Sequence, residues 1–120
     1  MVKTAVQTLR EARALIEAPE RWTRGELARD KNGDFCAPRS ANAVCWCSEG
    51  AMKKVGRTVA AWRLLESAVP NRNITRFNDG TYKNKPLGKQ PRPAPVRHRK
   101  VLAAFDKAIE LAEADESDER

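Results

Sequence analysis

Residues 2–19 read VKTAVQTLREARALIEAP, and this stretch indicates the type of fold because its apolar side chains recur at helical spacing. The recurring positions are Val2, Ala5, Val6, Leu9, Ala12 and Ile16. Intervals of three and four residues place these side chains on one face of an α-helix, and Pro19 stops the pattern. The stretch therefore predicts an amphipathic helix over residues 3–18 whose apolar face packs into a core.

Further helices are predicted by the same spacing along the rest of the chain. They cover residues 42–55, 58–69 and 96–114, and a shorter piece runs from Asn73 to a stop at Gly80. Ser40 or Asn42 is suited to cap the first of these helices, and Gly56 is suited to end it. Over residues 27–35, Asn32-Gly33 supplies the positive φ angles of a tight turn, which predicts a short hairpin or an ordered loop.

The composition indicates a single domain. With 120 residues, of which 41% are apolar and 32% charged, the chain can bury one core but not two. We expect a mainly α fold with minor β structure, in which residues 1–112 form a compact single-core helical domain with a short β-hairpin. Trp22, Trp46 and Trp62 are expected to anchor the core or its edge, since each can bury roughly 150 to 250 Å². Residues 113–120 are acidic without apolar spacing and predict a disordered tail.

The chain lacks the signals of a membrane or secreted protein. Its apolar runs are far shorter than the roughly 20 residues that cross a bilayer, and no signal-peptide core follows Met1. The odd number of cysteines, without the spacing of a disulfide framework, fits a reducing compartment. We therefore expect a cytoplasmic protein with free thiols and no membrane contact, whose oligomeric state the pattern leaves open.

Positive charge is concentrated in residues 72–100, which carry nine Lys or Arg side chains against one acid, Asp79, and four prolines. Residues 81–95 lack the periodicity of a helix or a strand, so they predict a long, basic, proline-rich loop of the kind that is usually functional or disordered. Such a segment favours a polyanionic or acidic partner, although a basic loop kept for solubility stays open as the alternative. The candidate binding residues are Arg72, Arg76, Tyr82, Lys83, Lys85, Lys89, Arg92, Arg97, Arg99 and Lys100.

Metal binding and catalysis are disfavoured by the residue spacing. Cys36, Cys45, Cys47 and His98 make up a nominal zinc set. On the predicted helix, however, residues two apart point about 200° away from each other, and structural zinc sites favour two to four intervening residues. Core packing is the simpler interpretation of the cysteines. Because the sequence also lacks a phosphate-binding loop, a paired-histidine motif and a nucleophile elbow, we predict no metal, no cofactor and no enzymatic activity.

Four motifs carry a resemblance to a known family. They are Trp22-Thr23-x-Gly25-x-x-Ala28-Arg29-Asp30-x-x-Gly33, Ala43-Val44-Cys45-Trp46-Cys47-x-x-Gly50-Ala51, Ile74-x-x-Phe77-Asn78-Asp79 and Val101-x-x-x-Phe105-Asp106-x-Ala108-Ile109. In order and spacing the chain resembles a family of small uncharacterised bacterial and phage domains that has no assigned activity. It departs from that family at Phe77, where tryptophan is usual, and in residues 81–95, which are longer and more basic.

The resemblance implies that four polar residues are shared across that family: Arg29, Asp30, Asn78 and Asp79. They form either a common polar site or a set of ion pairs and helix caps. We favour capping and ion pairing, because a small domain needs such groups to satisfy its backbone donors.

Two function classes follow from the basic segment. The first is a small non-catalytic protein that binds nucleic acid or a nucleoprotein through residues 81–100, by backbone contacts with little sequence preference. The second is a phage or mobile-element inhibitor or adaptor that presents the same loop to a bacterial protein machine, for example a defence complex. A role for the cysteines in thiol or metal chemistry is a third, weaker alternative.

Overall fold

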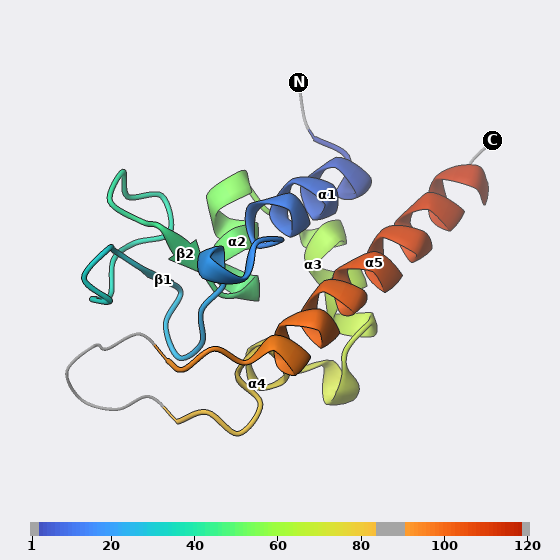
Figure 1. The fold of residues 1–120 in the computed structure, drawn as a ribbon. Helices are drawn as coiled ribbons and strands as arrows, with labels where there is room; N and C mark the ends of the chain where they lie inside the picture. Colours follow the sequence, from blue (N-terminus) through green and yellow to red (C-terminus); the bar gives the residue numbers. More distant parts are fainter. Residues whose placement is uncertain (1–2, 84–90, 119–120) are drawn as a thin grey trace.

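The computed structural model describes residues 3–83 and 91–118 (Figure 1). Its elements run in the order α1 (Ala5–Leu15), η1 (Pro19–Arg21), β1 (Ala28–Arg29), β2 (Cys45–Trp46), α2 (Ser48–Val55), α3 (Val59–Ser67), η2 (Pro70–Arg72), α4 (Ile74–Asp79) and α5 (Pro95–Asp118). The two η elements are single turns of 3₁₀-helix, and β1 pairs antiparallel with β2. The fold is therefore mainly helical with minor β structure, as the sequence predicts.

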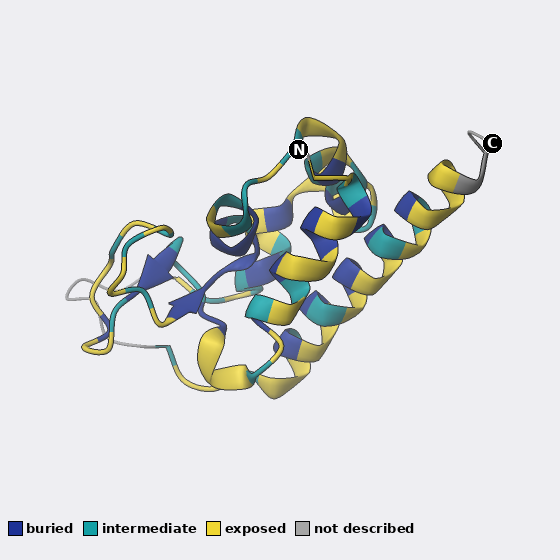
Figure 2. Cartoon of the chain, turned by 90° about the horizontal axis from the view of Figure 1, so that it is seen from above, coloured by how far each residue is buried: buried dark blue, intermediate teal, exposed yellow. Residues whose placement is uncertain are grey.

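The core lies where α1, α2, α3 and α5 meet. Helix α1 packs against α2, α3 and α5, and α3 packs against α5. Leu9, Leu65 and Phe105 are among the largest side chains that are fully buried there. Burying each of them contributes about 1.5 to 3 kcal/mol. In Figure 2 the buried residues lie on the faces that these helices turn toward one another, so the apolar faces predicted from the sequence do form the core.

Helix α1 begins and ends for local reasons. Thr4 Oγ1 accepts a hydrogen bond from Gln7 N at 3.1 Å, and Gln7 Oε1 accepts one from Thr4 N at 2.9 Å. This capping box satisfies two backbone donors and starts the helix at Ala5. Pro19 holds Ala18 in extended backbone (φ −73°, ψ 132°), so the helix cannot include residue 18 as predicted, and it ends at Leu15.

The helix predicted over residues 42–55 is shorter, and the prediction for its first part is wrong. Cys45 and Trp46 form strand β2, because β1 offers backbone partners: Val44 N donates to Arg29 O at 2.9 Å, and Cys47 N donates to Leu27 O at 3.2 Å. Helix α2 starts only at Ser48. Its cap is neither Ser40 nor Asn42 but Cys47, whose Sγ accepts a hydrogen bond from Gly50 N at 3.3 Å.

The turn at Asn32-Gly33 is present, but the hairpin prediction is only partly right. Gly33 has a positive φ of 83°, whereas Asn32 does not, so the turn is not the two-residue type that the dipeptide favours. Asp30 shapes it, since its carboxylate accepts hydrogen bonds from the backbone N–H groups of Asn32 and Asp34. Pairing across this turn is limited to an isolated bridge between Arg29 and Phe35, and β1 forms its sheet with β2.

Helix α5 continues through residues predicted to be disordered. It runs to Asp118, so residues 113–118 are helical and the predicted end at residue 114 is wrong. Glutamate and alanine favour helix, and an established helix extends at little cost per residue. Glu113 also pairs with Arg10 of α1 at 2.5 Å. Despite the length of α5, the described residues contain no helix apolar enough to cross a membrane.

The three tryptophans differ in burial. Trp22 and Trp46 are buried, and Trp46 Nε1 donates to Pro38 O at 2.8 Å. Trp62 is only half-buried and packs at the edge of the core, beneath the guanidinium group of Arg57 at 4.7 Å. The expectation that all three anchor the core or its edge is confirmed.

Candidate nucleic-acid interface

Three neighbouring depressions form a trough where the basic segment joins α5. The aromatic cavity, of about 600 Å³, is lined by Trp22 and His98 among others. The central depression, of about 340 Å³, shares Arg24, Ala94 and Pro95 with it. The outer depression, of about 240 Å³, shares Arg97 with the central one. We call these three depressions the trough; its arginines are Arg24, Arg76, Arg92 and Arg97.

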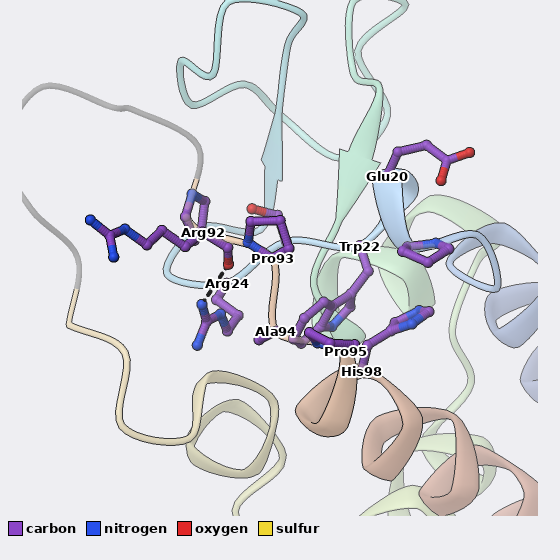
Figure 3. A pocket seen from close by; sticks show the side chains of 11 residues that line it. Glu20, Trp22, Arg24, Arg92, Pro93, Ala94, Pro95 and His98 are labelled. Atoms are coloured by element: carbon purple, nitrogen blue, oxygen red, sulfur yellow. Dashed lines mark hydrogen bonds between the residues drawn. The ribbon is translucent and has the colours of Figure 1, made fainter.

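Aromatic rings hold two of these arginines in place. The guanidinium carbon of Arg24 lies 5.0 Å from the ring centre of Tyr82 and 5.8 Å from that of Trp22. Its Nη2 donates to Arg92 O at 2.9 Å, and its buried Nε has no hydrogen-bond partner in the described structure (Figure 3). Arg97 lies 5.4 Å from the ring centre of Phe77 and donates to Phe77 O at 3.3 Å. Stacking on rings leaves the positive charge of both side chains available to a ligand.

Carboxylates do not neutralise the trough. The ion pairs found among the described residues join Lys3, Arg10, Arg13, Lys53 and Lys107 to acids elsewhere, and none involves a described cation between residues 72 and 100. The acid in the central depression is Asp79, whose Oδ1 already accepts hydrogen bonds from Gly25 N at 3.1 Å and Asn78 Nδ2 at 3.0 Å. Glu20 lines the aromatic cavity, so four arginines face two carboxylates and the trough keeps a net positive charge.

The start of α5 adds backbone donors to the central depression. Pro95, Val96 and Arg97 line that depression and form the first turn of the helix. The N–H group of His98 donates to Ala94 O, whereas those of Val96 and Arg97 have no acceptor in the described structure. Free N–H groups at a helix start favour a bound anion. The central depression thus combines two arginines with a helix end of the same sign.

The structure gathers only part of the predicted set. Arg76, Arg92 and Arg97 line the trough, and Tyr82 supports it from below Arg24. Lys83, Arg72, Arg99 and Lys100 are exposed but line none of the three depressions. Arg99 follows Arg97 by two residues and so points about 200° around α5 from it. Lys85 and Lys89 lie outside the described residues.

The sequence analysis did not include Arg24 among the candidate residues; it placed Trp22 among the expected core anchors and His98 in the nominal zinc set. Arg24 lies far from the basic segment in sequence and reaches it only through the fold. Trp22 and His98 are buried, with ring centres 5.2 Å apart, and His98 Nε2 lies 2.7 Å from Ile16 O. No local sequence signal could have paired residues 76 positions apart.

The buried side-chain amide of Asn78 holds neighbouring residues of the trough in place by hydrogen bonds. Asn78 Oδ1 accepts hydrogen bonds from Trp22 Nε1 at 2.8 Å, Ser48 N at 3.0 Å and Ser48 Oγ at 2.7 Å. Asn78 Nδ2 donates to Thr23 O at 3.1 Å. Because Ser48 is the first residue of α2, Asn78 satisfies a donor at that helix start and fixes the orientation of the Trp22 ring.

In the structure, the hydrogen bonds of Arg29, Asp30, Asn78 and Asp79 are those of turn formation and capping. Arg29 is fully buried and donates to Thr23 Oγ1, Gly33 O and Arg24 O at 2.9 to 3.0 Å. Asp30 shapes its own turn, while Asn78 and Asp79 bind each other and the backbone at Ser48 and Gly25. The hydrogen bonds of these residues therefore brace the loops that carry Arg24.

Replacing Asn78 with alanine is expected to lower the free energy of unfolding by about 3 kcal/mol or more. Each buried donor or acceptor left without a partner costs about 1 to 3 kcal/mol, and the change strands groups on Trp22, Ser48 and Thr23. Asn73→Ala is the matched control, since Asn73 is exposed, caps α4 and costs about 1 kcal/mol when lost. Urea unfolding followed by circular dichroism measures both. Equal losses for the two variants would contradict this role of Asn78.

The cysteines lie in the core or against it, as predicted. The argument that Cys45 and Cys47 point away from each other on one helix, however, was wrong. Cys45 lies in a strand and Cys47 caps α2, so they are not two positions apart on a helix. Both are buried, while Cys36 is half-buried. Burial raises the pKa of the Cys47 thiol to about 12, and burial followed by the charge of Asp30 raises the pKa of Cys36. The described residues also bring no three metal-ligating side chains together.

Cys47 is expected to make the protein less stable in alkali. Its pKa rises from 9.0 to about 12 on folding, so below pH 9 both states keep the proton. Between pH 9 and 12 the unfolded chain loses a proton that the folded chain retains, and stability falls by up to about 1.4 kcal/mol per pH unit. Cys47→Ser keeps an acceptor for Gly50 N and removes the titration. Urea unfolding at pH 8 to 10.5 should show a flatter decline for this variant; identical slopes would refute the assignment.

Comparison with known proteins places the chain in a family. No curated protein and no solved structure is detectably similar to the chain. Residues 1–111, which include every described residue of the trough, match a family described as "Family of unknown function (DUF6197)". The chain therefore belongs to the DUF6197 family, as its resemblance to an uncharacterised family of small domains predicts.

Proposed function

We propose that this protein binds the phosphate backbone of nucleic acid along the trough and acts as a binding protein rather than an enzyme. Phosphates would lie against Arg76, Arg92 and Arg97, and one would occupy the central depression at the start of α5. Arginine suits this task because its planar fork can donate two hydrogen bonds to one phosphate.

The observation that carries the proposal is the set of charges at the start of α5. Arg97, Arg99 and Lys100 lie in its first two turns, where the helix dipole is itself positive, and no acid lies in the first turn. Each cation there costs about 0.3 to 1 kcal/mol, whereas an acid would stabilise the helix. Charges placed against the helix dipole, without neutralising carboxylates, support a role in binding an anion rather than in folding.

Nucleic acid is the polyanion that this surface suits best. The trough places aromatic rings directly beside its arginines, and single-stranded nucleic acid is bound through phosphate contacts combined with base stacking. Backbone contacts specify no sequence, so binding is expected to tolerate any base order. The alternative, a phage or mobile-element inhibitor that docks on an acidic protein, needs a partner with fixed stoichiometry.

Fluorescence anisotropy with labelled single-stranded DNA, duplex DNA and RNA, at 50 and 200 mM salt, tests the proposal. We expect binding to all three at 50 mM, with an affinity that falls at least about tenfold at 200 mM, because three phosphate contacts give at least that dependence. Absence of binding to every nucleic acid at 50 mM salt would reject the proposal. A stoichiometric protein partner, captured from bacterial lysate treated with nuclease, would then support the alternative.

A further inference from the structure

The aromatic cavity differs in chemistry from the rest of the trough. Trp22 and His98 lie beside each other on one side of it, and Arg24 lies across from them with Pro93 (Figure 3). Its walls are mostly rings and prolines, and its volume of about 600 Å³ falls within the range of ligand sites, about 300 to 1,000 Å³. The central depression, by contrast, combines Arg24 and Arg97 with free helix N–H groups.

Both rings in the cavity are held rigidly before any ligand arrives. Trp22 Nε1 donates to Asn78 Oδ1 at 2.8 Å, and His98 Nε2 lies 2.7 Å from Ile16 O. The two rings are tilted by 39° with centres 5.2 Å apart. A site whose groups are already fixed loses little conformational entropy on binding, which favours a flat, rigid ligand.

We propose that the aromatic cavity holds an unstacked base of single-stranded nucleic acid while its phosphate occupies the central depression. This inference rests on the proposed function. Arg24 lines both spaces, so one nucleotide can span them with its base on the ring side and its phosphate on the helix side. The Nε–H of this shared arginine is buried and has no hydrogen-bond partner among the described residues.

The charges around the two spaces also favour a base in the aromatic cavity and a phosphate in the central depression. Glu20 lines the aromatic cavity and is exposed, so a second phosphate there would meet a carboxylate. A neutral base meets no such repulsion, and it can stack against ring edges, prolines and the guanidinium plane of Arg24. A duplex keeps its bases stacked inside the helix, so the cavity predicts a preference for single strands.

The test compares two ligands of equal charge. One is a ten-nucleotide single strand of deoxycytidine, and the other has the same phosphates with every base replaced by an abasic spacer. The native protein is expected to bind the first at least about fivefold more tightly, since stacking of one base contributes at least that much. The salt dependence of the two affinities should be nearly equal, because the number of phosphate contacts is unchanged.

A variant then locates the base. Ala94→Phe fills the space between the aromatic cavity and the central depression without changing charge, and it should reduce the preference for the intact strand to less than twofold. Ala103→Phe is the matched control on an exposed part of α5 and should leave the preference unchanged. Thermal unfolding confirms that both variants fold.

The outcomes separate the two proposals. Equal, salt-dependent binding of intact and abasic strands by the native protein overturns the base cavity and leaves backbone binding in place; this comparison needs no variant. A preference that survives in Ala94→Phe also overturns it, because the base then binds elsewhere. Failure of both strands to bind at 50 mM salt rejects the proposed function and the base cavity together.

Discussion

A variant with four cations of the basic segment changed to glutamine is expected to lose most of its affinity for nucleic acid. The four are Arg76, Arg92 and Arg97, which line the trough, and Lys100, which lies three residues after Arg97 on α5. At 50 mM salt the loss should be on the order of a hundredfold or more, and the salt slope should fall by up to about 3.6 for a duplex or 2.8 for a single strand. These values follow because each phosphate contact contributes about 0.9 or 0.7 to the slope. Affinity measured at four salt concentrations gives both quantities.

Four exposed cations elsewhere provide a control with the same change in net charge. They are Lys31, Lys54, Arg57 and Arg63, none of which lines the trough, and all are to be changed to glutamine. The salt slope of this variant should differ from the native slope by no more than about 0.9, which is the contribution of one phosphate contact. If both variants lose equal affinity, the overall charge of the protein, and not the trough, is responsible for binding.

Gly50→Ala is expected to prevent folding or to cost more than about 4 kcal/mol, because overpacking is one of the few mechanisms by which a single substitution causes so large a loss. A Cβ at Gly50 would lie 1.8 Å from the carbonyl oxygen of Leu27 and 2.8 Å from its carbonyl carbon. Both are backbone atoms next to β1, where Leu27 O also accepts the hydrogen bond from Cys47 N. No side-chain rotation relieves the contact, so α2 would have to separate from the sheet.

Gly56→Ala is the control for Gly50→Ala, because it places the same methyl group at the residue that ends α2. Gly56 ends α2 with a φ of 90°, yet a Cβ there would meet only the Arg39 side chain, at 3.8 Å. The cost should be about 1 to 2 kcal/mol, the penalty of the left-handed backbone alone. Urea unfolding of both variants decides the matter: a Gly50→Ala protein as stable as Gly56→Ala would show that α2 and Leu27 are not in close contact.

Apolar periodicity was enough to predict α1, α3, α4 and most of α5. It failed at Cys45 and Trp46, because Val44, Cys47, Ala51 and Val55 happen to match helical spacing while a two-residue strand has no periodic signal of its own. The pairing of β1 with β2 is a long-range backbone interaction, which overrides local propensity. The end of α5 was missed for the opposite reason, since an acidic run without apolar spacing can still extend an existing helix.

The candidate site was only partly accessible from the sequence. Charge density along the chain identified Arg76, Arg92 and Arg97, because these residues belong to one basic segment. Arg24 could not be found this way: its contact with Arg92 joins residues 68 positions apart and depends on the loop that Asp79 and Asn78 hold. Charge density also included Arg99, which helical geometry turns away from the trough.

The most direct test of the trough is an NMR titration of ¹⁵N-labelled protein with a ten-nucleotide single strand at 50 mM salt. Binding along the trough predicts that the largest amide shifts occur in α4, in the first two turns of α5 and around Arg24, with the Arg24 and Arg97 side-chain Nε–H signals shifting as well. Shifts centred on α3 or the end of α2, or no shifts at all, would contradict nucleic-acid binding at this surface.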